Sequence, residues 1–173
     1  MKTLLVLRHA KSSWKDPDLP DHDRPLNKRG KKDAPVMGRL IGKKKLTPDW
    51  ILSSTAVRAM KTAESAAETS KFSGEIQFEE ELYLARPSTI IELIQKSAPK
   101  SAETILIVGH NPGFEELVGI LAGQKHLFPT AALAQIELAV ERWAELTPET
   151  EGRLIHLWRP KELVGESTPG HVG

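Results

Sequence analysis

The chain has 173 residues, of which 24 are lysine or arginine and 23 are aspartate or glutamate, so its formal net charge is +1. This length suits one domain with a real hydrophobic core, and the balanced charge gives no support for a nucleic-acid partner. No apolar run approaches the roughly 20 residues of a membrane span, so we expect no membrane partner either.

The chain contains no cysteine, which excludes disulfides, thiol catalysis and thiolate metal sites. Lys2 precedes an apolar run, but no small-residue cleavage pattern follows, so the N-terminus is not typical of a signal peptide. We therefore expect the protein in the cytoplasm.

The first predicted element is a strand over residues 3–7, an unbroken apolar run with β-branched members. Such a run is typical of a strand buried on both faces of a parallel sheet. It stops at Arg8 and His9, and open α/β sheets bind their ligands at this end of the strands. Residues 15–27 contain four aspartates and three prolines, which favour a loop beside that end.

A helix should follow from residue 28, with Asn27 as its N-cap, and Pro35 should kink or restart it. A second strand is expected over 50–52. Ser53, Ser54 and Thr55 then offer an N-cap to a helix that ends near Thr69. Alanines spaced along that helix give it a small-residue packing face.

The remaining segments continue the alternation of strands and helices. We expect, in chain order, a short strand near 76–78, a helix from 87 or 88, a strand over 104–108, a helix reaching about 122, and strands over 132–140 and 153–158. This order predicts a single-domain α/β three-layer sandwich with a mostly parallel sheet and an antiparallel strand pair near the C-terminus. The predicted domain spans 1–160, and 161–173 is expected to be a flexible tail.

Two histidines and two arginines fall where this topology brings segments together. Arg8 and His9 follow the first strand, Arg58 lies near the start of a helix, and His110 follows the strand over 104–108. Taken singly, each also fits a surface arginine or a turn histidine. Arg58 opposes the helix dipole there, and an anion bound at that helix N-terminus would relieve the mismatch.

Five segments, in this order and spacing, resemble the histidine phosphatase superfamily, and within it the small, capless SixA-type phosphohistidine phosphatases. They are LRHAKSSW (7–14), DRPLNKRG (23–30), SSTAVRAMKTA (53–63), VGHNPG (108–113) and PTAALAQIEL (129–138). The superfamily is usually recognised by Arg-His-Gly, and this chain has Ala10 at the third position, a variant common in the SixA-like branch.

The resemblance implies that His9 is a nucleophile that becomes transiently phosphorylated, and that Arg8, Arg58 and His110 complete a phosphate pocket. The chemistry agrees, because guanidinium groups hold the charge of a transferring phosphoryl group in bidentate geometry. Two arginines would keep His9 deprotonated for attack, whereas bound phosphate would raise the pKa of His110. The reaction would need no metal and no cofactor.

The general acid is the open assignment. Glu81 is the nearest candidate by position, although it belongs to an acidic triplet that also fits surface charge. Ser12 is a candidate donor to phosphate or, equally, a turn serine. Among the loop carboxylates, Asp23 is expected to form a structural pair with Arg24.

Three functions follow from these residues. The leading one is a hydrolase that removes phosphate from a phosphohistidine-bearing protein. The alternatives are a phosphatase that acts on a small phosphate ester, and a non-catalytic phosphate-binding module. Phosphohistidine has a good leaving group and so depends less on a general acid than an alkyl ester does.

Overall fold

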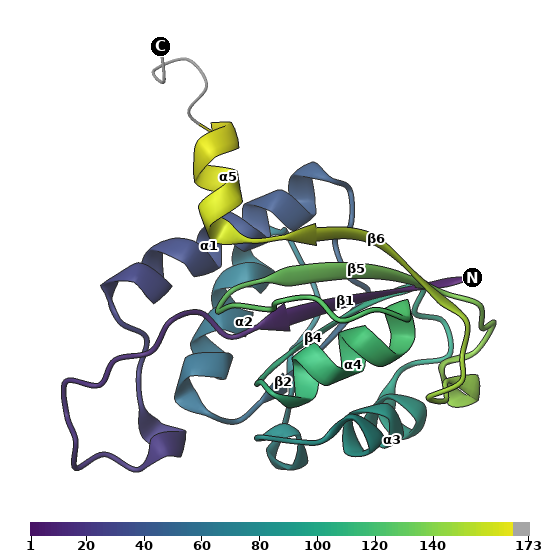
Figure 1. Cartoon of the computed structure of the whole chain (residues 1–173), viewed down its shortest axis with the longest axis horizontal. Helices are drawn as coiled ribbons and strands as arrows, with labels where there is room; N and C mark the ends of the chain where they lie inside the picture. The colour runs from purple at the N-terminus through teal and green to yellow at the C-terminus, as the bar shows by residue number, and fades with distance from the viewer. Residues whose placement is uncertain (168–173) are drawn as a thin grey trace.

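The computed structural model describes residues 1–167 of the chain. Its centre is a six-stranded sheet with the order β3-β2-β4-β1-β5-β6 (Figure 1). The strands are β1 (Lys2–Arg8), β2 (Trp50–Ser54), β3 (Gln77–Glu79), β4 (Thr104–Gly109), β5 (Leu133–Leu138) and β6 (Gly152–Trp158). The strands from β3 to β1 pair in parallel, whereas β5 runs antiparallel to both β1 and β6. The predicted mixed sheet is confirmed.

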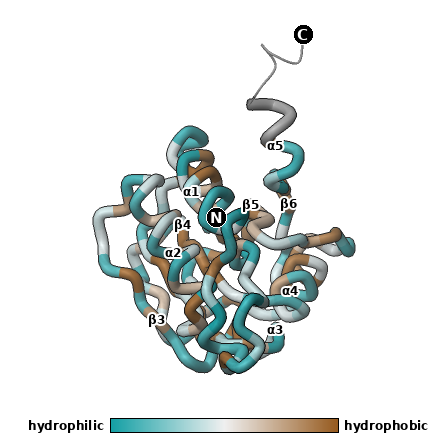
Figure 2. The backbone as a smooth tube through the Cα atoms, turned by 90° about the vertical axis from the view of Figure 1, so that its left-hand side faces the viewer, coloured by the Kyte–Doolittle hydropathy of each residue, from teal (hydrophilic) through white to brown (hydrophobic). Residues whose placement is uncertain are grey.

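Helices cover both faces of this sheet (Figures 1 and 2). On one face lie α1 (Lys28–Lys43) and α2 (Val57–Thr69), and on the other lie α3 (Pro87–Ser97) and α4 (Gly113–Ala122). Successive residues of β1 enter opposite cores: Leu5 and Leu7 face α1 and α2, while Leu4 and Val6 face α3 and α4. All four side chains are fully buried, as the apolar run predicts.

No helix among the described residues is long and apolar enough to cross a bilayer.

The local signals around α1 are borne out in part. The Asn27 side chain caps the helix by accepting a hydrogen bond of 2.8 Å from the Gly30 amide. Pro35 lies inside one continuous helix and does not divide it into two. The buried side chains of Ala34 and Met37, on either side of Pro35, keep the helix packed on the core.

The predicted N-cap of α2 is wrong. The N-cap residue is Ala56, and no side chain caps the helix. The Ser54 hydroxyl oxygen instead lies 2.8 Å from His110 Nε2 and accepts from the Ala56 amide at 3.2 Å. The Ser54 hydroxyl, which the local pattern predicted to cap α2, therefore contacts His110 instead.

The C-terminal segment also differs from the expectation of a tail that begins at residue 161. Helix α5 (Pro160–Ser167) covers the start of this segment, with proline at its first position, where the missing N–H costs nothing. The Leu163 side chain is buried and joins the core on the α1 side of the sheet. Residues 168–173 of the predicted tail lie outside the described residues.

Candidate active site

The register of β1 and β4 sets two histidines side by side. Arg8 pairs with Gly109, so the next residues, His9 and His110, leave the sheet at the same edge. The His9 amide donates to the Gly109 carbonyl at 2.9 Å, and the two imidazole rings lie 5.2 Å apart between centroids. A cavity of about 270 Å³ opens at this edge, and we call it the central cavity.

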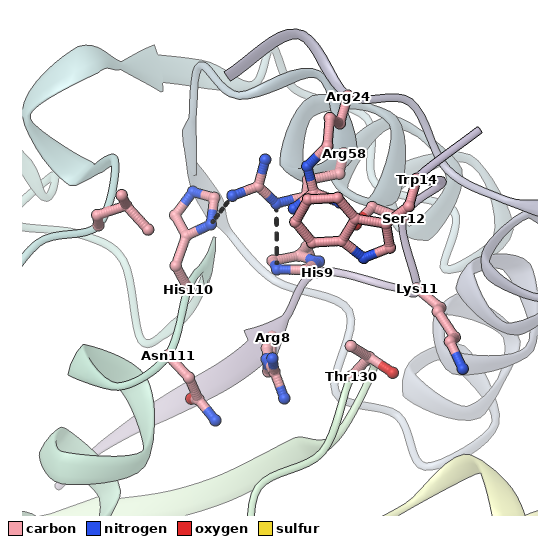
Figure 3. Close-up of a pocket in the computed structure, with 11 residues that line it drawn as sticks. Arg8, His9, Lys11, Ser12, Trp14, Arg24, Arg58, His110, Asn111 and Thr130 are labelled. Atoms are coloured by element: carbon pink, nitrogen blue, oxygen red, sulfur yellow. Dashed lines mark hydrogen bonds between the residues drawn. The ribbon is translucent and has the colours of Figure 1, made fainter. Parts of the chain in front are cut away.

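The central cavity collects most of the predicted site residues (Figure 3). Its lining includes Arg8, His9, Ser12, Arg58 and His110. Lys11, Trp14, Arg24, Leu84, Asn111 and Thr130 complete the lining. Its ionisable side chains are therefore all basic, a composition suited to an anion.

Hydrogen bonds fix the tautomer of His9. Its Nδ1 lies 2.7 Å from the Ala10 carbonyl oxygen, so we assign the proton to Nδ1 and the free lone pair to Nε2. Thr62 holds Ala10 in place, because its hydroxyl accepts from the Ala10 amide at 2.9 Å and donates to the Arg58 carbonyl at 2.7 Å. His9 can therefore present Nε2 as a nucleophile without first losing a proton.

Arg58 links both histidines to the loop between β1 and α1. Its Nε donates to His9 Nε2 at 3.3 Å, and its Nη2 lies 3.5 Å from His110 Nδ1 (Figure 3). Its Nη1 donates to the Asp21 carbonyl at 2.7 Å, and its Nη2 donates to the Asp21 carboxylate at 2.9 Å. The Arg58 side chain is 3% exposed, so this carboxylate balances a charge that is almost fully buried.

The two histidines are neutral at physiological pH. Burial, together with the guanidinium groups of Arg58, Arg8 and Arg24, lowers the pKa of His9 to about 4, against the opposing hydrogen bond to Ala10. Burial, with His9 and Arg58 nearby, lowers the pKa of His110 to about 3. The hydrogen bonds of His110 agree with a neutral ring, in which Nδ1 accepts from Arg58 and Nε2 donates to Ser54.

A short 3-10 helix, η1 (Asp21–Asp23), anchors the loop over the site. The Asp21 carboxylate accepts from Arg58, from Arg24 at 3.0 Å and from the Tyr83 hydroxyl. Burial acts to raise the pKa of Asp21, but these hydrogen bonds outweigh it and hold the pKa well below its usual range. The predicted pair of Asp23 with Arg24 is wrong, because the turn of η1 directs Asp21 to Arg24 three residues later, while Asp23 lies 3.6 Å from His22.

Arg8 extends along another wall of the cavity. Its Nη1 donates to the Phe128 carbonyl at 3.2 Å, and Asn111 donates to the same oxygen at 2.8 Å. Arg8 Nε is buried and has no hydrogen-bond acceptor among the described residues. An anion in the cavity is one group that could supply an acceptor.

The two less specific candidates lie in different surroundings. The Ser12 hydroxyl lines the cavity and accepts from Arg24 Nη1 at 2.6 Å, so it orients that guanidinium. Glu81 lies in η2 (Glu80–Leu82), is exposed, and is not among the residues that line the cavity. Its assignment as general acid stays a prediction.

Sequence reasoning did not place Asp21, Tyr83 or Ser54 in the site, and it treated Ser54 only as a candidate N-cap. Tyr83 is the single tyrosine of the chain, and its ring lies edge-on to His110 at 5.3 Å between centroids. The one available signal was the position of Asp21 in the loop that follows the first strand. Within the described residues, no group of three or more histidine, aspartate and glutamate side chains is arranged to hold a metal ion.

Comparison with known proteins identifies the family of the chain. Residues 4–83 match the family model of the histidine phosphatase superfamily, branch 1. The protein Rv1276c of Mycobacterium tuberculosis is 34% identical over 153 residues, which cover 82% of this chain and 92% of that protein. The chain therefore belongs to the histidine phosphatase superfamily.

Solved structures place it within that superfamily. A SixA protein from Agrobacterium tumefaciens, named as a candidate phosphohistidine phosphatase, superposes with a TM-score of 0.78 at 30% identity, over 92% of this chain and 98% of that one. The protein histidine phosphatase SixA in complex with tungstate has the same fold, with a TM-score of 0.78 at 20% identity over 93% and 99% of the two chains. The chain is of the SixA type.

Proposed function

We propose that this protein is a metal-independent phosphohistidine phosphatase that acts through a phosphorylated His9. The observation that carries the proposal is the geometry of His9: its Nδ1 proton is held by the Ala10 carbonyl, which leaves Nε2 unprotonated and facing Arg58, in a cavity whose ionisable groups are all basic. The similarity to SixA proteins supports the substrate class. The cytoplasmic location stays a prediction.

The reaction has two displacements at phosphorus. His9 Nε2 forms a bond to the phosphorus atom of the substrate as the bond from phosphorus to the substrate imidazole nitrogen breaks, and that nitrogen takes a proton from solvent water. Water then attacks the phosphorus of phosphorylated His9, the P–N bond breaks, and inorganic phosphate and free His9 remain. Each step balances without an oxidant or a metal ion.

Arg8, Arg58 and His110 serve this sequence by holding the phosphoryl oxygens. Phosphoryl transfer gathers charge on three equatorial oxygens, and guanidinium groups already fixed in place stabilise that charge without reorganisation. A bound phosphate dianion would raise the pKa of both histidines. It would also accept from Arg58 Nε, which donates to His9 Nε2, and the His9 Nε2 lone pair would then be available for attack.

The absence of a carboxylic acid from the cavity lining supports phosphohistidine over an alkyl ester. Asp21 adjoins the site, but its low pKa and its three hydrogen-bond donors keep it ionised, so it is a poor proton donor. An imidazole leaves more readily than an alkoxide, and a site without a strong acid is sufficient for it.

The decisive experiment is to trap the intermediate. Wild-type protein is mixed with radiolabelled phosphohistidine, quenched in alkali, which preserves phosphohistidine, and digested so that the labelled residue can be identified. We expect label on His9, no label in His9→Ala, and wild-type labelling in His156→Ala, a control on the exposed part of β6. Turnover should persist in EDTA. Label on another residue, or loss of turnover that a divalent cation restores, would overturn the proposal.

A further inference from the structure

A groove rich in lysine adjoins the central cavity. It has a volume of about 980 Å³, and we call it the basic groove. It is lined by Lys11, Ser12, Ser13, Trp14, Lys15, Pro25, Leu26, Asn27, Lys28, Arg29 and Lys31. Lys11, Ser12 and Trp14 also line the central cavity, so a ligand could occupy both hollows at once.

The basic groove carries more positive charge than neighbouring carboxylates neutralise. Five of its residues are basic and none is acidic. Arg29 pairs with Asp33 at 3.4 Å, whereas none of the four lysines has a carboxylate within 4.0 Å among the described side chains. Since the net charge of the whole chain is only +1, this excess is local to the groove. An anionic partner would interact with it at long range and at contact.

The packing of α1 brings these charges together. A side chain at Gly30 would place its Cβ 2.1 Å from the Lys11 carbonyl oxygen, so only glycine allows the segment after β1 to lie against the start of the helix. The Asn27 amide in turn donates to the Lys11 carbonyl at 3.0 Å. Lysines from the loop and from the first turn of α1 therefore line one groove, where the helix dipole adds positive potential.

Apolar surface in the groove indicates which kind of anion fits. Trp14 is 74% exposed at the junction with the central cavity, and the Arg24 guanidinium lies 3.5 Å from its ring centroid. Pro25, which is exposed, adds aliphatic surface beside the lysines. A peptide that mixes acidic and apolar side chains complements this lining better than a uniform polyphosphate backbone does.

We propose that the basic groove binds an acidic segment that flanks the phosphorylated histidine of the substrate protein. This inference rests on the proposed phosphatase function and adds a specificity element to it. The groove would contribute to recognition of the partner and to the rate of encounter, while the central cavity carries out the chemistry. A volume near 980 Å³ is at the upper end of the range for ligand sites and accommodates a few peptide residues.

The test compares two synthetic peptides of equal length, each phosphorylated on a single histidine with phosphoramidate. One carries glutamate and aspartate on either side of the histidine, and the other carries glutamine and asparagine. The groove variant is Lys15→Glu/Lys28→Glu/Lys31→Glu. The matched control is Lys43→Glu/Lys44→Glu/Lys45→Glu, which makes the same charge change at exposed positions at and just beyond the far end of α1.

We expect the wild type and the control to favour the acidic peptide by about tenfold in kcat/KM at low salt, with the preference falling as salt is added. The groove variant should lose or reverse this preference while it hydrolyses free phosphohistidine at the wild-type rate. Equal kcat/KM for the two peptides in the wild type, or an equal loss in the control, would overturn the assignment.

A binding measurement separates this inference from the proposed function. Fluorescence anisotropy of the labelled, unphosphorylated acidic peptide requires no turnover, so a failed phosphatase assay leaves the groove testable. We expect binding to the wild type and the control that is lost in the groove variant. Tight binding of a single-stranded RNA of equal charge, with no binding of the acidic peptide, would assign the groove to nucleic acid and overturn the proposal.

Discussion

Asp21 and Arg58, 37 residues apart, form the ion pair that joins the loop between β1 and α1 to the sheet edge that carries His9 and His110, with 2.9 Å between Oδ2 and Nη2. The same guanidinium donates to His9 Nε2. Asp21 does not line the central cavity, so it acts on the site through Arg58. We therefore expect Asp21 to act as a positioning residue: removing its charge should change the orientation of Arg58 without removing a group that contacts the phosphoryl oxygens.

We expect Asp21→Asn to lower kcat by about 10- to 100-fold, the range expected when a catalytic group is misplaced by about 1 Å. Affinity for inorganic phosphate should hold or rise, because the substitution removes a negative charge near the anion. Kinetics with phosphate as a product inhibitor separate the two effects. Asp18→Asn, an exposed change in the same loop, is the control and should leave both values unchanged.

The single tyrosine offers a second measurement on the same variant. Burial raises the pKa of Tyr83, and its hydrogen bond to Asp21 raises it further. Ultraviolet titration of the tyrosinate should therefore show a lower Tyr83 pKa in Asp21→Asn than in the wild type. An unchanged Tyr83 pKa would mean that Asp21 does not hold Tyr83 and Arg58 together in solution.

The burial of neutral His9 and His110 makes stability depend on pH. In the unfolded chain a histidine binds a proton below about pH 6.5, whereas the folded pKa of His9 is about 4 and that of His110 about 3. Between the folded and unfolded pKa values the unfolded state binds more protons. The contribution of the two neutral histidines to the free energy of unfolding is therefore fully present above pH 6.5, and it is lost as pH decreases toward 4 and 3.

Removing one of these histidines should flatten that dependence. Between about pH 4.5 and pH 6, His9→Gln should reduce the slope of unfolding free energy against pH by up to about 1.4 kcal/mol per pH unit, the value for one proton. Urea denaturation at a series of pH values gives this slope. The control is His156→Gln, at an exposed position, and a slope in His9→Gln equal to that of the wild type would contradict a buried neutral His9.

The anion site gives a prediction on binding. Arg58→Ala should weaken phosphate or vanadate binding by about 1.5–3 kcal/mol, the usual contribution of a hydrogen bond to a charged group. Isothermal titration calorimetry measures the difference directly. Arg39→Ala removes an exposed arginine of α1 and should bind as the wild type does. Equal losses in the two variants would mean that the anion is held by overall charge and not by this site.

The sequence contained enough information to predict the sheet and the four residues at its edge. Arg8, His9 and His110 could be placed because each follows a buried apolar strand, and strand ends in a parallel sheet meet at one edge. Their neighbours could not be placed in the same way. Tyr83 reaches Asp21 across 62 residues and Ser54 reaches His110 across 56, and such contacts depend on tertiary packing that no local pattern records.

The loop between β1 and α1 illustrates the same limit at short range. Its prolines and aspartates predicted an irregular segment, and η1 is a single 3-10 turn. Arg24 pairs with Asp21 and not with Asp23 because that turn brings residues three apart together. Arg58 binds the other carboxylate oxygen of Asp21, so it holds the Asp21 side chain in place beside Arg24. Composition alone makes the two aspartates equivalent.

The last prediction concerns the proton donor and so the choice between phosphohistidine and an ester as substrate. Well-placed general acids contribute about 10²- to 10⁴-fold, and an alkoxide leaving group needs that help where an imidazole does not. Glu81 is exposed and absent from the cavity lining, so Glu81→Gln should change phosphohistidine turnover by less than about twofold. Glu80→Gln, its neighbour in η2, controls for the loss of surface charge.

We expect the wild type to be slow on a small alkyl phosphate such as glycerol phosphate. Rapid alkyl phosphate turnover that Glu81→Gln abolishes and Glu80→Gln preserves would assign Glu81 as the acid. It would also make a small phosphate ester the better candidate for the natural substrate.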